Sequence, residues 1–377
     1  MADFLAVQDK MEDGVEKGIF PGAVILVSQG KELVFHKACG FRSISPKKEI
    51  MTEDTIFDIA SLTKVVATTA AIMILIKEDK LHLEDKISNF IPDFSTKEKE
   101  AITLRHLLNH CAGLPDWFPF YKELLERKDS STCICKKEAK QYIYQRANRE
   151  PVVYPPGESY KYSDIGFIIL GEIIEIITGT SLDKFCKEKI FAPLSLSDTF
   201  FRNLLEENSS FAEKRQNSFF ASTENCPWRD KILEGEVHDD NAYAMGGVAG
   251  HSGLFSTGND LNSFTVEILR CYKGEGKFLP QRIVKEFFLR QNIIRDSSWA
   301  LGWDTPSPGI STSGHYFSER SVGHLGFTGT SIWIDLEREI IVTLLTNRVH
   351  PTREARGFAK FRPEIHDLIM KELGICT

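Results

Sequence analysis

The sequence predicts an α/β protein of the α+β type, in which strands from both ends of the chain form one antiparallel sheet. The segments AVILVSQGKELVFHKACG (residues 23–40) and SIWIDLEREIIVTLLT (331–346) each hold two β-rich runs around a short polar turn, as a hairpin does. The chain between them is dominated by helical patterns. We therefore expect the two hairpins to share one sheet and the middle to form a mostly helical lobe.

Each end of the chain also carries a helical pattern suited to covering this sheet. Near the N-terminus, one apolar stripe consists of Phe4, Val7, Met11 and Val15. The segment RPEIHDLIMKEL predicts a C-terminal helix that begins at Pro363, because proline is favoured in a first helical turn. Its apolar face consists of Ile365, Leu368, Ile369 and Leu373.

Four segments in the middle of the chain predict helices: Ser61–Lys77, Thr103–Asn109, Ser163–Thr178 and Leu182–Ile190. Breaks rich in Pro and Gly, CAGLPDW and VVYPPGESY, separate several of them. The expected division is a discontinuous sheet domain of residues 1–80 together with 255–377, and a mainly helical domain of residues 81–254.

Composition limits the possible partners. Lys and Arg number 46 against 53 Asp and Glu, a net charge of −7 that gives no general attraction to nucleic acid or anionic lipid. The longest apolar runs, such as Val65–Ile76, are shorter than a membrane span, so none is expected. The first residues lack the apolar core of a signal peptide, which predicts a cytoplasmic protein. A periplasmic or extracellular chain that had lost its leader would look the same.

The eight cysteines do not predict a metal or a disulfide framework. They are scattered along the chain, and the one close pair, Cys133 and Cys135, has C-x-C rather than C-x-x-C spacing. We expect free thiols, no metal and no cofactor.

Ser61 and Lys64 are the first candidates for chemistry. They stand three residues apart and so share one face of a helix. A serine hydroxyl becomes a useful nucleophile when a neighbouring base takes its proton, and a lysine with a lowered pKa can be that base. S-x-x-K occurs four times, but only Ser61 opens an apolar helix directly after a β-like run, TIFDIA. The alternative is that Ser61 is a plain helix N-cap.

Two further segments add candidate polar groups. In YKYSDIGF, Tyr162 and Asp164 lead into a helix, although an aromatic packing residue followed by a cap explains them equally. In SVGHLGFTGTSIWID, His324 and Gly326 lie on or beside a strand, where a glycine lets another backbone approach closely. A rival H-x-G is present at His251.

Taken in order, these segments resemble those of the penicillin-recognising serine hydrolases: class C β-lactamases, DD-peptidases (penicillin-binding proteins) and family VIII carboxylesterases. That family's signature is S-x-x-K, then Y-x-N, then K-T-G or H-x-G, at separations similar to those of positions 61, 162 and 324. Intervening segments such as TLRHLLNHCAGLPDW also look like family segments, so the resemblance covers nearly the whole chain. It implies the β-lactamase/transpeptidase-like fold, with the active site between the two lobes.

The resemblance also implies roles. Ser61 would be the nucleophile, with Lys64 and Tyr162 as the proton-handling pair. The backbone N–H groups of Ser61 and Phe327 would form the oxyanion hole. The substrate-binding positions would be Asp164, His324 and Gly326.

Two residues depart from the family pattern. His324 replaces the K-T-G lysine and is weakly charged near neutral pH, which argues against recognition of a substrate carboxylate at this position. Asp164 replaces asparagine. A carboxylate facing Lys64 would keep that amine protonated, and the ammonium would then lower the pKa of Tyr162 and favour Tyr162 as the base.

Two other segments hold polar or glycine-rich patterns that have simpler explanations than a metal site or a phosphate-binding loop. His238, Asp239 and Asp240 have side chains that ligate metals but no third partner at a recognised spacing, so we expect a solvated loop. GGVAGHSG lacks the ending of a phosphate-binding loop, and we expect it to border the cleft, with His251 supporting the site.

The predicted function is a serine acyl hydrolase that forms an acyl-Ser61 intermediate on a small ester, amide or β-lactam. Esterase or small-amide hydrolase ranks first, β-lactamase second and DD-peptidase third, because of His324 and Asp164 and the absence of an export signal. The rival of another class is a non-catalytic binding or scaffold protein that keeps the fold. The oligomeric state is not indicated.

Overall fold

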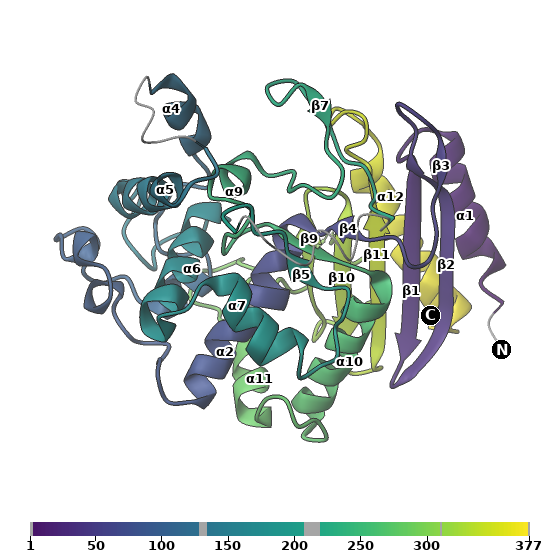
Figure 1. Cartoon of the computed structure of the whole chain (residues 1–377). Helices are drawn as coiled ribbons and strands as arrows, with labels where there is room; N and C mark the ends of the chain where they lie inside the picture. Colours follow the sequence, from purple (N-terminus) through teal and green to yellow (C-terminus); the bar gives the residue numbers. More distant parts are fainter. Residues whose placement is uncertain (1–2, 128–133, 207–218, 310, 376–377) are drawn as a thin grey trace.

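A six-stranded antiparallel sheet forms the centre of the computed structural model, which describes residues 3–127, 134–206, 219–309 and 311–375 (Figure 1). The strand order is β3-β2-β1-β11-β10-β9. The strands are β1 (Gly22–Gln29), β2 (Glu32–Ser43), β3 (Glu49–Ile50), β9 (Val322–Gly326), β10 (Thr330–Asp335) and β11 (Ile340–Thr346).

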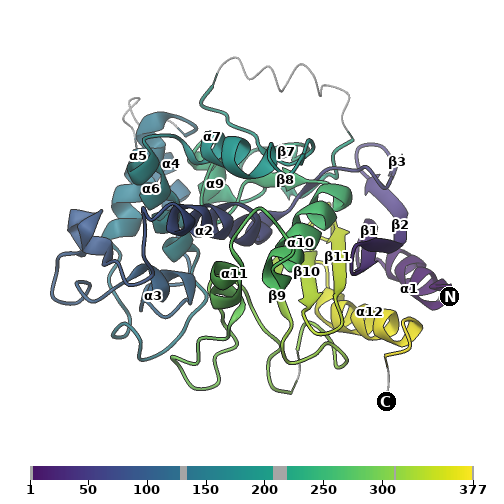
Figure 2. The same ribbon diagram turned by 90° about the horizontal axis from the view of Figure 1, so that it is seen from below.

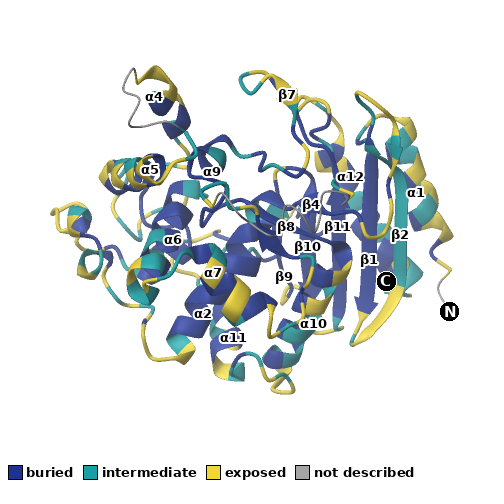
Figure 3. Cartoon of the chain, viewed as in Figure 1, coloured by how far each residue is buried: buried dark blue, intermediate teal, exposed yellow. Residues whose placement is uncertain are grey.

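The two predicted hairpins meet along β1 and β11, which pair antiparallel from Ala23 opposite Thr346 to Gln29 opposite Ile340. All of β11 and all but the last residue of β1 are buried, as expected for the central strands of a sheet covered on both faces (Figure 3). The prediction of one antiparallel sheet built from both ends of the chain is confirmed.

Helices α1 (Leu5–Glu16) and α12 (Phe358–Glu372) cover one face of this sheet (Figure 1). Both were expected, but α12 begins five residues before Pro363, so the predicted start of this helix was wrong. Phe358 and Phe361 explain the longer helix, because both rings pack edge-on against Phe20, with centroids 6.1 and 5.0 Å away. This apolar packing holds an extra N-terminal turn.

The opposite face packs against α10 (Gly258–Lys273) and, beyond it, α11 (Gln281–Phe288) and α2 (Ala70–Lys77) (Figure 2). Neither α10 nor α11 was predicted from the sequence. One apolar core joins this face of the sheet to the helical part, and it includes Leu26, Ile332 and Ile341 together with α2. The proposed domain boundaries at 80/81 and 254/255 stay a prediction.

Between the terminal segments the chain is mostly helical, as predicted. Its helices are α3 (Leu104–Leu108), α4 (Phe120–Glu126), α5 (Lys137–Arg149), α6 (Asp164–Thr178), α7 (Leu182–Cys186, continued by a π-helical turn, Lys187–Phe191) and α9 (Asp240–Ala244). Short strands form two small sheets: β4 (Phe57–Asp58), β8 (Leu254–Ser256) and β5 (Phe200–Phe201) in one, and β6 (Asn225–Cys226) with β7 (Lys231–Ile232) in the other.

The predicted helix Ser61–Lys77 is present but changes its hydrogen-bonding pattern along its length. It begins as a 3-10 turn (Ala60–Leu62), continues as a π-helix (Lys64–Thr69) and ends as α2. Within the described residues, this segment is the one unbroken helix that is long and apolar enough to cross a membrane, judged by length and composition alone. However, 83% of its most apolar stretch is buried inside the protein, as in a core helix.

Six of the eight cysteines lie in the described part of the chain, and all six are free: Cys39, Cys111, Cys135, Cys186, Cys226 and Cys271. This agrees with the prediction for these positions. Cys133 and Cys376 lie outside the described residues.

Candidate active site

Ser61 lies on a sharp turn between β4 and the helix that leads into α2. The preceding Ala60 has a φ of 47°, a left-handed conformation that costs a non-glycine residue energy. The carboxylate of the buried Asp58 compensates, because it accepts hydrogen bonds from the backbone N–H of Ala60 at 2.9 Å and of His238 at 2.6 Å. A strained backbone held in this way presents Ser61 from a fixed position.

Lys64 occupies a fully buried position directly behind Ser61. Its Nζ donates to Ser61 Oγ at 3.0 Å and to the backbone carbonyl of His251 at 2.8 Å, and it forms an ion pair with Asp164 Oδ1 at 2.7 Å. The Ser61 hydroxyl is therefore engaged by the lysine, and no side-chain cap bond is formed at this helix start. Asp164 thus faces Lys64, which is the condition under which its carboxylate was expected to keep the amine protonated.

Tyr162 reaches the same point from the loop before α6. The next residue, Ser163, caps α6 by accepting from Gly166 N–H at 3.1 Å, and its hydroxyl donates to the Pro115 carbonyl at 2.6 Å. These bonds anchor the backbone beside Tyr162, whose hydroxyl hydrogen-bonds with Ser61 and Lys64. Three rings flank it, with centroids at 4.7 Å for His110, 5.6 Å for Trp299 and 6.0 Å for His324.

The electrostatic balance of this group differs from the sequence-based expectation in one respect. Burial acts to lower the pKa of Lys64, but its interactions with Asp164, the largest of them, and with the Tyr162 hydroxyl outweigh burial and raise that pKa. Burial raises the pKa of Tyr162, and the opposing effect of Lys64 is smaller. The expectation of a lowered Tyr162 pKa is therefore wrong, because it ignored desolvation of the phenolate. The two raised pKa values favour an ammonium at Lys64, in its ion pair with Asp164, and a neutral phenol at Tyr162.

The segment that holds His324 and Gly326 packs against the turn that carries Ser61, because Gly326 has no side chain to prevent the contact. A Cβ at Gly326 would lie 2.6 Å from the backbone oxygen of Ile59 and 2.0 Å from Thr330 Oγ1, so no larger residue fits without a shift. Thr330 donates to the Ile59 carbonyl at 3.1 Å, and Thr328 donates to the Asp58 carbonyl at 2.8 Å. The turn between β9 and β10 is thereby fastened to the segment that carries Ser61.

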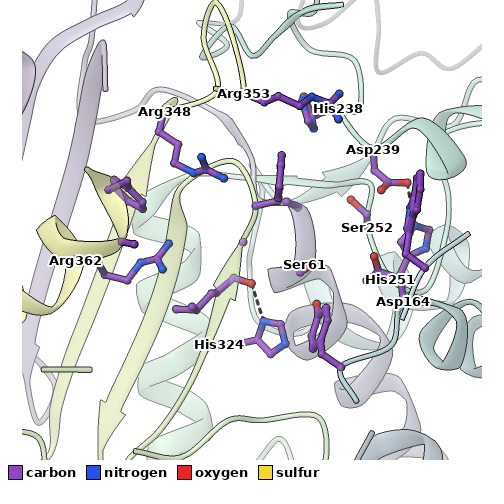
Figure 4. Close-up of a pocket in the computed structure, with 18 of the residues that line it drawn as sticks. Ser61, Asp164, His238, Asp239, His251, Ser252, His324, Arg348, Arg353 and Arg362 are labelled. Carbon is purple, nitrogen blue, oxygen red and sulfur yellow. Dashed lines mark hydrogen bonds and ion pairs between the residues drawn. The ribbon is translucent and has the colours of Figure 1, made fainter. Parts of the chain in front are cut away.

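His324, on β9, is a buried and neutral residue. Burial, followed by the nearby charge of Lys64, lowers the pKa of His324 to about 3. Its Nδ1 donates to the Leu325 carbonyl at 2.9 Å (Figure 4), and its Nε2 has no hydrogen-bond partner within the described residues. His324 therefore adds no positive charge to the site at neutral pH.

One cleft of about 870 Å³ connects these groups. Ser61 lies in its wall together with Tyr162, Asp164, His324, Gly326 and Phe327, whereas Lys64 is enclosed behind it. The two residues expected to supply the oxyanion hole, Ser61 and Phe327, thus border the same space. The rival histidine, His251, also lines the cleft, and its backbone contacts Lys64, in line with the supporting role expected for it.

The expectation of a solvated loop at His238–Asp240 was wrong. His238 and Asp240 are buried and, with Asp239, line the cleft. Asp239 caps α9 and accepts from His251 Nε2 at 2.9 Å, while His238 pairs with Glu224 at 3.2 Å. The backbone N–H of His238 also donates to Asp58, 180 residues away in the sequence, so no local pattern could have shown this burial. Within the described ranges, no group of three His, Cys, Asp or Glu side chains is arranged to hold a metal.

A serine hydroxyl bonded to a buried lysine, at the edge of a cleft between a sheet and a helical lobe, defines a serine hydrolase of the S-x-x-K class. The chain belongs to the β-lactamase family, because the sequence profile described as Beta-lactamase matches residues 7–364. The fold and class expected from the resemblance are confirmed.

Two bacterial relatives illustrate the range of activities in the family. A protein of Escherichia coli K12 named "Putative D-alanyl-D-alanine carboxypeptidase" is 30% identical over 351 residues, which cover 88% of this chain and 79% of that protein. The N-acetylmuramyl-L-alanine amidase of Bacillus subtilis 168 is 31% identical over 369 residues, which cover 90% of this chain and 81% of the amidase.

Solved structures share the fold at lower identity. The octameric penicillin-binding protein homologue from Pyrococcus abyssi superposes with a TM-score of 0.74 at 20% identity, covering 99% of this chain and 78% of the homologue. EstCE1, a hydrolase with promiscuous acyltransferase activity, gives a TM-score of 0.73 at 19% identity, covering 96% and 97% of the two chains.

Proposed function

We propose that this protein hydrolyses a small amide or ester through an acyl-enzyme intermediate on Ser61. The observation that carries the proposal is the position of Lys64 Nζ, 3.0 Å from Ser61 Oγ and 2.7 Å from Asp164 Oδ1. The serine hydroxyl has a nitrogen partner within proton-transfer distance, and that nitrogen has a second partner that can hold its extra proton.

Proton transfer in this proposal follows the contacts of Lys64. Because the amine is protonated at rest, it first passes a proton to Asp164 and then accepts the proton of Ser61 as Ser61 Oγ attacks the substrate carbonyl. Tyr162, a neutral phenol, donates its proton to the leaving nitrogen or oxygen and is reprotonated by Lys64. Asp164 then returns its proton to Lys64. The net result is transfer of the serine proton to the leaving group, cleavage of the scissile C–N or C–O bond and formation of an ester at Ser61, which water then hydrolyses to restore the serine.

Charge that develops on the carbonyl oxygen needs donors that are already in position. We assign this role to the backbone N–H groups of Ser61 and Phe327. The hydrogen bonds of Thr328 and Thr330 to the backbone just before Ser61 support this assignment, because they limit movement of the two segments relative to each other.

The substrate class is inferred from the cleft and from the relatives. A volume of about 870 Å³ suits a small molecule rather than a folded protein. The amidase relative favours an amide, and the carboxypeptidase-named relative keeps a DD-peptidase activity as an alternative. β-Lactamase activity is the other alternative, disfavoured by the neutral His324 at the position of the family's lysine.

Covalent labelling tests the nucleophile. Intact-mass spectrometry after incubation with a fluorophosphonate should show one adduct on the wild-type protein and none on Ser61→Ala. Ser181→Ala, which alters another S-x-x-K serine, is the matched control and should be labelled normally. Labelling that persists in Ser61→Ala would disprove the assignment. A panel of a short-chain p-nitrophenyl ester, N-acetylmuramyl-L-alanine, a chromogenic cephalosporin and a D-Ala-D-Ala peptide then ranks the substrate classes.

A further inference from the structure

Three arginines in the wall of the cleft have no acidic partner within the described residues: the partly buried Arg348, the buried Arg362 and the exposed Arg356. The first two are held in place by neighbouring rings. Arg348 follows β11 and Arg362 lies on α12. Arg362 is only 7% exposed, and its Nε has no hydrogen-bond partner in the described part of the chain. Burying a guanidinium group without a counter-charge costs folding free energy. The unpaired Arg362 therefore needs an explanation other than stability.

Two other arginines of this region show the usual arrangement: Arg229, whose side chain is buried, and Arg353, whose side chain is partly exposed. Arg229 pairs with Glu236 at 3.4 Å and with Asp240 at 2.9 Å, and Arg353 pairs with Glu224. Burial lowers the pKa of Arg362 to about 9, with a further contribution from the charge of Arg348, and burial lowers the pKa of Arg348 as well. The two unpaired cations thus repel each other.

Aromatic rings hold both guanidinium groups beside the same space. The Phe358 ring centroid lies 4.7 Å from the Arg362 guanidinium and 5.9 Å from that of Arg348. Arg348 also lies 4.9 Å from the ring centroid of Phe327. Figure 4 shows the two arginine side chains extending from neighbouring elements toward the part of the cleft that continues to Ser61. Ring contacts of this kind fix orientation but leave the N–H donors free.

We propose that Arg348 and Arg362 form an anion subsite that binds a carboxylate or phosphate group of the substrate while its scissile carbonyl lies at Ser61. Guanidinium groups suit this task, because their N–H donors bind both oxyanions bidentately. The inference rests on the proposed function and narrows it to small amides or ester substrates that carry a negative charge. Anion recognition is thereby placed next to α12 rather than at the uncharged His324.

Binding to the Ser61→Ala protein tests the subsite without requiring turnover. Isothermal titration calorimetry would compare N-acetyl-L-alanine with its neutral partner, N-acetyl-L-alaninamide, and would include inorganic phosphate as a second oxyanion. We expect the better of the two anions to bind about tenfold to hundredfold more tightly than the neutral amide, the usual effect of charge-assisted hydrogen bonds. The preferred anion then identifies the charged group of the substrate.

Variants of the arginines distinguish anion binding at the subsite from an effect of the protein's overall charge. Arg348→Gln and Arg362→Gln, each added to Ser61→Ala, should remove the preference for the anion. Arg295→Gln removes the same charge from a side chain that is 95% exposed and lies outside the cleft. This variant should keep the preference for the anion. Equal binding of the anions and the amide to Ser61→Ala, or a preference that survives both cleft variants, would overturn the proposal.

Thermal unfolding gives a second readout. Removing an unpaired buried cation should raise the melting temperature of Arg362→Met in the absence of ligand, and phosphate or N-acetyl-L-alanine should stabilise the wild type but not this variant. Stabilisation of both proteins by the same anion to the same extent would argue against the subsite. Anion binding at the arginines in a protein that hydrolyses none of the panel substrates would refute the proposed function and leave the subsite standing.

Discussion

The ammonium group of Lys64 lies 2.7 Å from Oδ1 of Asp164, with the lysine side chain fully buried and the aspartate side chain 20% exposed. The pair joins the helix that follows Ser61 to the first residue of α6 across the base of the cleft. It neutralises the lysine's charge and holds the amine against Ser61. Among the interactions that raise the pKa of Lys64, the one with Asp164 is the largest.

Asp164→Asn should move the pH dependence of acylation to lower pH. The carboxylate helps to raise the pKa of Lys64, so its removal lowers that pKa, and the free amine appears at a lower pH than in the wild type. Single-turnover acylation by a p-nitrophenyl ester, measured across the pH range, checks the direction. An unchanged pH profile would assign Asp164 a purely structural role.

Tyr162→Phe should slow acylation by about 10²–10⁴-fold, the usual effect of losing a positioned acid–base group. Substrate affinity should change little, because the ring and its contacts with His110 and Trp299 remain. Since burial raises the pKa of Tyr162, we expect the loss to be greater for an amide, whose leaving nitrogen needs a proton, than for an activated p-nitrophenyl ester. Equal losses for both substrates would contradict the assignment of Tyr162 as proton donor.

Gly326→Ala should abolish most activity and lower the melting temperature. The added methyl group would lie 2.6 Å from the Ile59 carbonyl oxygen and would push β9 away from the turn that carries Ser61. Gly166→Ala is the matched control, because the nearest atom to its new Cβ is 3.7 Å away and alanine favours its helix. The control should keep wild-type activity; a similar loss in both variants would show that Gly326 has no special steric role.

Glu224 should make stability depend on pH in the acid range. Burial opposes ionisation of its carboxyl group, but hydrogen bonds from His238 and Arg353 outweigh burial and lower the pKa of Glu224 to about 2. Its stabilising effect, roughly 2–3 kcal/mol, is therefore fully present above the unfolded-state pKa of about 4.3 and is lost as the pH falls toward 2. Urea unfolding of the wild type and Glu224→Gln at several pH values measures this effect. The difference in unfolding free energy between the wild type and Glu224→Gln should become smaller as the pH falls from about 4.3 toward 2. A difference that stays constant would contradict the stabilising role of the ionised Glu224.

Much of the site could be predicted from the sequence, because its patterns are local. The three-residue spacing of Ser61 and Lys64 brings them onto one face of any helical turn. The resemblance of the motifs at positions 61, 162 and 324 to the family signature implied which distant segments meet. The terminal hairpins are equally local, since each needs only two β-rich runs and a short turn. Membership of the family and the antiparallel sheet followed from these features.

Tertiary structure alone decided the properties that depend on many distant neighbours. The pKa of Tyr162 rises because desolvation by the whole surrounding fold exceeds the opposing effect of Lys64, the cation that the sequence motifs place beside it. The burial of His238 depends on Glu224 and Phe327, and the unpaired state of Arg362 depends on which carboxylates the fold keeps away from it. Spacing along a chain determines which side chains share a face, whereas solvation and charge balance are sums over three-dimensional surroundings that appear only when the chain is folded.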